Sequence, residues 1–186
     1  MKLIETRLQG VWLIEPRVFK DARGFFFESY HAGKFAAAGI RTEWLQDNHA
    51  GSVRDTLRGL HFQRGVGQAK MVRCITGEIW DVVVDLRPDS SAFGSWHAEI
   101  LSSENHRMLY IPEGFAHGYA VLSDWSEVVY KCGTEYDPAT EDGIMWNDPD
   151  IAVAWPLSTP LLSDRDRTNQ TLREYRRKMG DRKSVV

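Results

Sequence analysis

The sequence has few cysteines and no long apolar run. Only Cys74 and Cys132 are cysteines, and they are not spaced as a CxxC pair. This argues against a disulfide framework and favours reduced thiols. No apolar segment approaches the roughly 20 residues of a membrane span, and the first ten residues lack the apolar core of a signal peptide. We therefore expect a cytoplasmic protein without membrane contact.

Basic charge is not in excess either. The chain has 23 Lys and Arg against 26 Asp and Glu, a formal net charge of -3. No overall positive field favours nucleic acid, so an anion would need a local site. A length of 186 residues with 42% hydrophobic residues suits one globular domain. We predict a single domain over residues 1–186, with 181–186 as a frayed polar tail.

Helical patterns are scarce, and strand patterns dominate. Only residues 31–38 and 171–178 have helical features. The connection Thr76-Gly77-Glu78 between two apolar runs predicts a hairpin. Many short strands with little helix favour an all-β jelly roll, an antiparallel sandwich or barrel with a few short helices and a C-terminal helix. The predicted strands cover residues 10–14, 24–30, 69–76, 78–86, 96–101, 107–111, 117–122 and 127–132.

His61 lies in the densest cluster of residues that could do chemistry, Leu57–Gln63. Strand alternation sends Arg58 and His61 to opposite sides, although a bend at Gly59 could bring them into one cavity. A single strand histidine is more often structural than catalytic. Lys70, on the next apolar segment, could likewise be a lysine at the rim of the fold. Taken one by one, these residues leave both interpretations open.

A third cluster is the Pro-Gly turn Ile111–His117, which begins a strand. Its PEGFAH pattern resembles the second cupin motif, PxGxxH, and this would put His117 inside a jelly-roll barrel. A metal-binding cupin would be expected to show an HxH motif and then a glutamate, whereas this chain has His-Phe-Gln from His61 and then Lys70. An ammonium group repels a divalent cation, so we expect no metal.

His61, Lys70 and Tyr130 together would supply a base, a fixed positive charge and a phenolic acid. This set suits removal of a proton beside a carbonyl group. Tyr130 lies in a Val-Val-Tyr strand and Asp166 near the C-terminus, where core and surface positions are the ordinary alternatives. Only their joint occurrence favours chemistry.

Six segments follow one another in an informative order. They are Asp21–Glu28, Gln46–His49, Leu57–Gln63, Ile111–His117, Val129–Cys132 and Leu162–Asp166. Together they closely resemble the dTDP-4-dehydrorhamnose 3,5-epimerase family across roughly Leu3 to Asp166. One position departs from the family pattern: where a pair of tyrosines is expected, the chain has Glu135 and then Tyr136. Loss of one ring could change the preferred nucleotide.

The resemblance implies a role for each reactive group. His61 would accept the proton, and the carboxylate of Asp166 would orient His61 and favour its charged form. Tyr130 would donate a proton from the opposite face of the sugar, and Lys70 would face the ketone oxygen. Arginine suits a diphosphate because its guanidinium donates two parallel hydrogen bonds. From the residues alone, Asp47-Asn48 could be a turn and Glu141 a loop residue. The implied substrate contacts are Arg23, Glu28, Gln46, Asp47, Asn48, Arg58, His117, Tyr136, Glu141 and Arg165.

The implied activity is inversion of C3 and C5, or of C3 alone, in a nucleotide-linked 4-keto-6-deoxyhexose. The expected reaction converts dTDP-4-dehydro-6-deoxy-D-glucose to dTDP-4-dehydro-L-rhamnose without a cofactor. The resemblance also implies a homodimer with exchange of N-terminal strands, so that Arg23 and Glu28 could serve the neighbouring site.

The sequence is also compatible with three alternatives to epimerisation. A sugar-nucleotide 3,4-ketoisomerase would move the carbonyl group, and a non-catalytic cupin would bind a sugar nucleotide without proton exchange. Tyr130 opposite His61 favours epimerisation over the ketoisomerase, whereas solvent isotope exchange would separate an enzyme from the binding protein. A metal-dependent cupin oxygenase is disfavoured by the ligand set.

Overall fold

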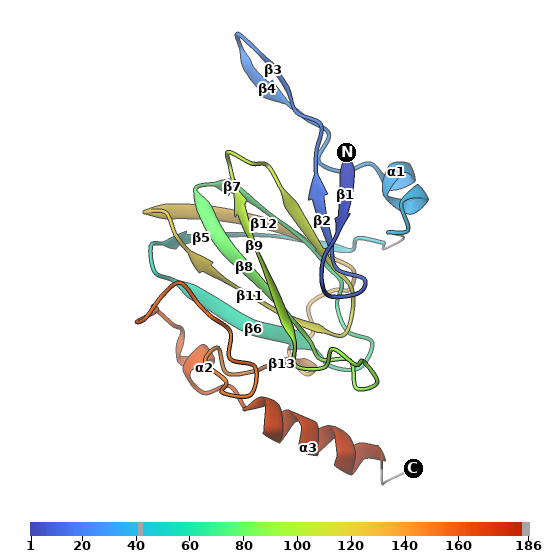
Figure 1. Ribbon diagram of the computed structural model, residues 1–186, viewed down its shortest axis with the longest axis vertical. Helices are drawn as coiled ribbons and strands as arrows, with labels where there is room; N and C mark the ends of the chain where they lie inside the picture. The colour runs from blue at the N-terminus through green and yellow to red at the C-terminus, as the bar shows by residue number, and fades with distance from the viewer. Residues whose placement is uncertain (41–42, 184–186) are drawn as a thin grey trace.

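The computed structural model describes residues 1–40 and 43–183, in which strands dominate (Figure 1). None of the helices in this part of the chain combines the length and apolar character of a membrane span. The elements in chain order are β1 (Lys2–Glu5), β2 (Trp12–Glu15), β3 (Phe19–Asp21), β4 (Gly24–Phe26), α1 (Ala32–Ala37), β5 (Gln46–Val53), β6 (Leu57–Gln63), β7 (Lys70–Thr76), β8 (Glu78–Asp85), β9 (Trp96–Ser102), β10 (Met108–Ile111), β11 (Phe115–Val121), β12 (Trp125–Cys132), β13 (Glu141–Gly143), α2 (Asp164–Arg167) and α3 (Leu172–Lys183).

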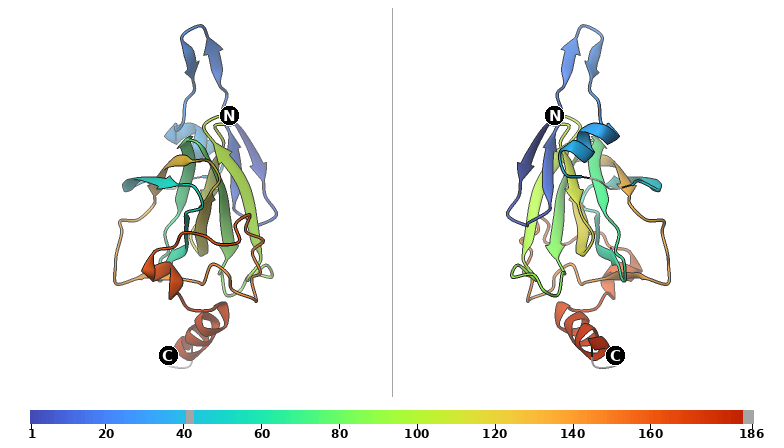
Figure 2. Two further views of the ribbon diagram at one scale, coloured as in Figure 1. Left: turned by 90° about the vertical axis from the view of Figure 1, so that its left-hand side faces the viewer. Right: turned by 90° about the vertical axis from the view of Figure 1, so that its right-hand side faces the viewer.

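Two antiparallel sheets form a sandwich (Figure 2). The larger sheet has six strands in the order β1-β2-β10-β7-β12-β5, and the smaller has five in the order β13-β6-β11-β8-β9. From β5 to β8, and again from β9 to β13, each successive strand lies in the other sheet. This alternation is typical of a jelly roll. The predicted all-β jelly roll with a C-terminal helix is confirmed.

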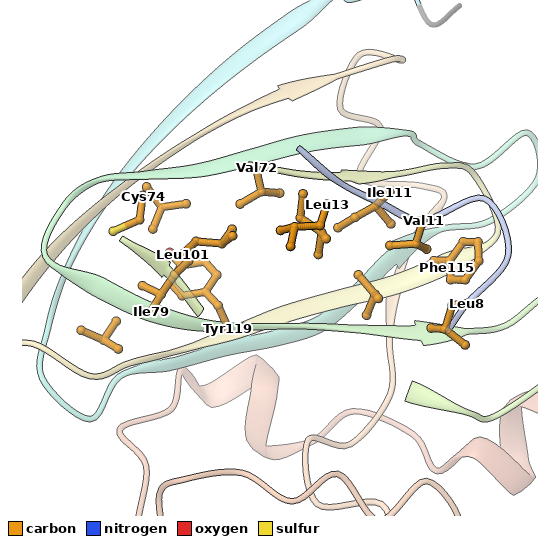
Figure 3. Packing of buried hydrophobic residues seen from close by; sticks show 14 residues of the cluster. Leu8, Val11, Leu13, Val72, Cys74, Ile79, Leu101, Ile111, Phe115 and Tyr119 are labelled. Carbon is orange, nitrogen blue, oxygen red and sulfur yellow. The ribbon is translucent and has the colours of Figure 1, made fainter. Parts of the chain in front are cut away.

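Apolar side chains from both sheets fill the space between them (Figure 3). Val72 and Ile111 project from the larger sheet, and Ile79 and Phe115 from the smaller one. Strand alternation sends the intervening residues to the outer faces. There, α3 packs on the smaller sheet and α1 on the larger one, where Phe35 of α1 is buried. A helix from the N-terminal part of the chain thus covers part of one outer face, and a helix from the C-terminal part covers part of the other.

The predicted hairpin between β7 and β8 is wrong. β7 pairs with β10 and β12, whereas β8 pairs with β9 and β11 in the other sheet. Two serine hydroxyls replace the hydrogen bonds of a hairpin: the Glu78 N–H donates to Ser123 Oγ at 2.9 Å, and Ser126 Oγ donates to the Glu78 carbonyl at 3.0 Å. With these backbone groups satisfied, the chain can turn from one sheet into the other.

Several predicted boundaries also change. The strand predicted over 24–30 is only β4, Gly24–Phe26, and β5 and β13 form where turn or loop residues were the alternatives. The C-terminal helix runs to Lys183, so the tail predicted from 181 begins inside α3, and 184–186 lie outside the described residues. The single domain stays a prediction.

The β3-β4 hairpin projects from the sandwich, as both views show (Figures 1 and 2). Phe25 and Phe26 are 60% and 70% exposed. The rings of Phe25 and Phe27 stack at 6.0 Å between centroids, and both contact the ring of His106, which lies between β9 and β10. Two large apolar side chains are therefore exposed on the projecting arm.

We expect Gly77→Ala to destabilise the fold strongly. Gly77 has a φ of +74°, and an added Cβ would overlap Ser123 Oγ and the carbonyl oxygen of Trp125. The cost should be about 3 kcal/mol or more of unfolding free energy, measured by urea denaturation. Gly65→Ala is the matched control, because Gly65 has a φ of +76° but open space around it; it should cost about 1–2 kcal/mol. Equal losses in the two variants would contradict the packing argument.

Candidate active site

A cavity of about 180 Å³ lies between the sheets. His61 reaches it from β6 in the smaller sheet, and Lys70 and Tyr130 reach it from β7 and β12 in the larger sheet. The structure thus brings three of the four predicted catalytic residues to one cavity from opposite sides. The full lining is Ala50, Arg58, His61, Lys70, His117, Gly118, Tyr119 and Tyr130.

A bulge in β6 brings Arg58 and His61 to this same cavity. His61 lies opposite His117 on β11, whereas Arg58 lies opposite Tyr119, so three steps along β6 match two along β11. Gly59 stands in the extra position with a φ of +113°, and an added Cβ would lie 2.6 Å from the backbone of β11. Only glycine allows the strands to approach this closely. Of the two arrangements that the sequence left open, the bent one is observed.

The fourth residue, Asp166, holds the imidazole of His61 from behind. His61 Nε2 lies 2.5 Å from Asp166 Oδ1, and the carboxylate belongs to a residue only 3% exposed. Ser163 is the N-cap of α2, and its hydroxyl donates to Asp166 Oδ2 at 2.8 Å. Burial alone would raise the pKa of Asp166, but the hydrogen bonds from His61 and Ser163 and the charge of Arg165 lower it below its usual value. Asp166 is therefore the ionised partner of the pair.

Lys70 carries a charge that lacks a close partner. Its ammonium group makes no hydrogen bond or ion pair with residues 1–40 or 43–183. Desolvation lowers the pKa of Lys70, while its cross-strand partner Cys132 and the carboxylates of Glu141 and Asp81 act in the opposite direction. An anion that binds in the cavity would compensate for the lost hydration of the Lys70 ammonium group, and the ammonium group would stabilise the anion.

Tyr130 faces the cavity as a neutral phenol. Desolvation raises its pKa, and nearby Cys132 and Glu141 add to the rise, although Arg58 opposes it. A phenol with a raised pKa stays protonated at neutral pH. Tyr130 is thus available as a proton donor.

His117 belongs to a second pair that the sequence did not predict. Its Nε2 lies 2.8 Å from Oδ2 of Asp81, which is wholly buried in β8. The other carboxylate oxygen of Asp81 has no hydrogen-bond partner in the part of the chain that the structure describes. A carboxylate within the apolar run Ile79–Val84 was the signal that could have identified it. Tyr119 could likewise have been found, since it alternates with His117 along the same strand.

Four predicted contact residues form one hydrogen-bonded network. Tyr136 Oη donates to Glu141 Oε2 at 2.6 Å, and Arg165 Nη1 lies 2.6 Å from the same oxygen. The Tyr136 N–H donates to Gln46 Oε1 at 2.8 Å. Burial would raise the pKa of Glu141, but these hydrogen bonds from Arg165 and Tyr136 lower it. The network ties β5 and β13 to α2, which carries Asp166.

Asp47 and Asn48 lie on edge strand β5, beside a neighbouring cavity of about 290 Å³ that Tyr130 also lines. Asp47 forms an ion pair with Lys131 at 3.0 Å. Asn48 Nδ2 donates to Cys132 Sγ at 3.4 Å. These predicted contacts thus adjoin the His61 cavity but do not line it.

Arg23 and Glu28 are not brought to either cavity. Arg23 lies at the tip of the β3-β4 hairpin, with its side chain 90% exposed and paired with Asp21 at 2.6 Å. Glu28 pairs with Lys34 at 2.7 Å. Neither residue therefore lines the two cavities of its own chain.

The side chains around the cavity do not form an obvious set of metal ligands among the described residues. His61 and His117 both direct Nε2 to a carboxylate, and Lys70 stands beside them. No group of three or more His, Cys, Asp or Glu side chains suited to a metal ion occurs within residues 1–40 and 43–183. That metal takes no part stays a prediction.

Comparison with known proteins gives consistent matches. The family model described as dTDP-4-dehydrorhamnose 3,5-epimerase matches residues 5–174. The dTDP-4-dehydrorhamnose 3,5-epimerase of Pseudomonas aeruginosa is 50% identical over 169 residues, covering 90% of this chain and 93% of the relative. The dTDP-4-dehydrorhamnose 3-epimerase of Streptomyces niveus is 42% identical over 178 residues, covering 95% and 86%. A crystal structure of dTDP-6-deoxy-D-glucose-3,5-epimerase from Legionella pneumophila in complex with dTDP-4-keto-L-rhamnose has a TM-score of 0.90 at 41% identity, covering 92% of this chain and 93% of that one.

We expect Ser163→Ala to raise the pKa of Asp166, because it removes one hydrogen bond to the carboxylate. The carboxyl titration can be followed by carbon-13 NMR. In the wild type the lowered pKa means that Asp166 stabilises the fold at neutral pH, and that this contribution disappears as the pH falls through the lowered value. Thr168→Ala is the control, since it removes a hydroxyl at the other end of α2 that bonds only to carbonyl groups. An unchanged pKa of Asp166 in Ser163→Ala would show that the Ser163 hydroxyl does not stabilise the carboxylate.

Proposed function

The chain belongs to the dTDP-4-dehydrorhamnose 3,5-epimerase family, and on that premise we propose that it inverts C3 and C5 of a nucleotide-linked 4-keto-6-deoxyhexose. The proposed substrate is dTDP-4-dehydro-6-deoxy-D-glucose. The predicted family and enzyme class, a sugar-nucleotide epimerase, are confirmed by these relatives. The observation that supports the substrate class and mechanism is the meeting of His61, Lys70 and Tyr130 in one cavity, with Asp166 behind His61.

The chemistry begins with a ketone at C4. It makes the hydrogens on C3 and C5 acidic, because either carbanion delocalises onto the ketone oxygen as an enolate. His61 would take the proton, and the ionised carboxylate of Asp166 would stabilise the imidazolium that forms. The bond from Nε2 to Asp166 leaves Nδ1 as the ring nitrogen that accepts the proton. The carbon is neither oxidised nor reduced in this step.

Lys70 would stabilise the enolate oxygen. Its ammonium group is desolvated and has no close counter-charge, so a developing oxyanion would gain more from it than the neutral ketone does. This is the condition for lowering the barrier, because the interaction strengthens between the ground state and the transition state.

Inversion needs a proton from the other face of the sugar. Tyr130 projects from the larger sheet and His61 from the smaller one, so a ring held between them would meet an acid on one side and a base on the other. The raised pKa of Tyr130 keeps its proton in place until the carbanion forms. The opposed pair favours inversion over transfer of the carbonyl group between C3 and C4.

We expect His61→Asn to stop exchange of solvent deuterium into C3 and C5 of dTDP-4-dehydro-6-deoxy-D-glucose and to lower turnover about 10²–10⁴-fold. Proton NMR of the sugar measures both quantities. His97→Asn is the matched control, because His97 also pairs with a strand carboxylate, Glu99 at 3.1 Å, but lines neither cavity. Exchange that continues in His61→Asn would remove His61 as the base.

In the same assay, Tyr130→Phe should keep exchange while losing inversion, and Lys70→Met should lower both about 10²–10³-fold. Full epimerisation by Tyr130→Phe would remove Tyr130 as the acid. A 3,4-ketoisomerase would instead give a 3-keto product, and a non-catalytic binding protein would show no exchange even in the wild type.

A homodimer that exchanges its β3-β4 hairpins is part of the same proposal. Arg23 and Glu28, which the resemblance assigns to substrate, lie on and beside the projecting arm, away from the cavity of their own chain. The exposed Phe25 and Phe26 would gain about 25 cal/mol for each Å² of apolar area covered by a partner. Exchange would bring Arg23 to the neighbouring site.

Mixing defective chains tests this arrangement. Arg23→Ala and His61→Asn chains, refolded together, should regain activity, because the Arg23→Ala subunit would keep its own His61 and receive Arg23 from its partner. Lys70→Met mixed with His61→Asn is the control and should stay inactive, since both residues lie in one cavity of one chain. Failure of the first mixture, with monomers in sedimentation velocity, would contradict strand exchange.

We also propose that the chain acts in the cytoplasm. Both of its cysteines, Cys74 and Cys132, are unpaired and buried, as is usual in a reducing compartment. Desolvation raises the pKa of Cys74 to about 11, so its thiol stays protonated and unreactive.

A further inference from the structure

A second, larger cavity opens where α3 meets two loops of the sandwich. It has a volume of about 820 Å³ and shares no lining residue with the cavity of His61. Its walls come from the β1-β2 connection, the segment from β8 into β9, residues 150–151 and the first half of α3. Figure 1 shows α3 at the end of the molecule opposite the β3-β4 hairpin. The cavity thus lies away from the arm proposed to contact a second subunit.

The floor of this cavity is apolar and firmly held. Leu8, Ile151 and Leu172 are all buried. Figure 3 shows Leu8 beside Phe115 at one end of the central core, and Ile151 and Leu172 belong to the cluster under α3. These buried residues support the partly exposed apolar lining, Ala92, Phe93 and Trp96, on which a planar apolar group could rest.

Three arginines surround this floor, and two of them have no anionic partner. Arg7 stacks over the ring of Trp96 at 4.7 Å, and Arg176 lies over Phe93 at 5.7 Å. Neither guanidinium makes a hydrogen bond or ion pair with the residues that the structure describes. Arg173 pairs with Asp150 at 3.2 Å, the one acidic residue in the lining. A local excess of positive charge therefore stands in a chain whose net charge is -3.

From these features we propose that the cavity binds a nucleoside diphosphate at a site separate from catalysis. Stacking on Trp96 and Phe93 fixes the planes of the Arg7 and Arg176 guanidinium groups, which leaves their N–H edges for the phosphates. Bidentate hydrogen bonding of this kind suits phosphate oxygens. The base would cover the apolar floor, and the cavity volume lies within the range of small-molecule sites.

The indole N–H signal of Trp96 in nitrogen-15 NMR, assigned with Trp96→Phe, reports on this site directly. Titration of the full chain with thymidine diphosphate should shift it, and Arg7→Ala and Arg176→Ala should each weaken the binding at least about tenfold. Arg177→Ala is the matched control, because Arg177 is on the same helix but does not line the cavity; it should leave the binding unchanged. Ring signals of His61 report the catalytic cavity separately, so failure at one site is distinguishable from failure at the other.

Several results would overturn the proposal. One is a Trp96 signal that does not shift at saturating nucleotide. A second is a titration in which Arg7→Ala and Arg176→Ala bind the nucleotide as tightly as the wild type does. Another is pyrophosphate binding as tightly as thymidine diphosphate, since the base would then contribute nothing. A change of oligomeric state in Arg7→Ala, seen by sedimentation velocity, would assign the cavity to contact with a second copy of the chain.

Discussion

Strands β6 and β7 are consecutive in the chain but lie in opposite sheets, so the residues they carry face each other across the sandwich. His61 points inward from one sheet and Lys70 from the other, with Tyr130 beside Lys70 on β12. The facing arrangement depends on every connection that crosses between sheets. It also explains why a base and an acid can stand on two sides of one small cavity without a flexible loop to position them.

The regular part of this architecture could be predicted from the sequence, and the irregular part could not. Alternating patterns identified most strands, and the order of the motifs identified the family, because both are local properties of the chain. The β7-β8 connection was misjudged because its composition fits a hairpin, whereas the hydroxyls that satisfy its backbone come from Ser123 and Ser126, far along the chain. The bulge at Gly59 was left open for the same reason, since a bulge is defined by the partner strand.

The site residues divide in the same way. His61, Lys70 and Tyr130 were proposed from the resemblance and do meet, and their roles stay proposals until tested. The pairing of Asp81 could not be predicted although a carboxylate in an apolar strand is unusual, because its partner His117 lies on another strand, 36 positions away. Asp81 is wholly buried with one carboxylate oxygen unpaired among the described residues, and the half-buried Lys70 is partly desolvated, so both reduce the stability of the unliganded fold. Their presence in the core is understandable if a polar ligand supplies the missing interactions.

The pairing of His61 with Asp166 also has a consequence for synthesis. The two residues are 105 positions apart, and Asp166 follows every strand of both sheets. Because chains fold from the N-terminus as they emerge, the sandwich can assemble before the segment with Asp166 is available. A ribosome-bound chain would then hold a formed cavity with an unoriented imidazole. Catalytic competence would arrive only when α2 has left the ribosome, so a nascent chain that lacks α2 would have the cavity without its oriented base.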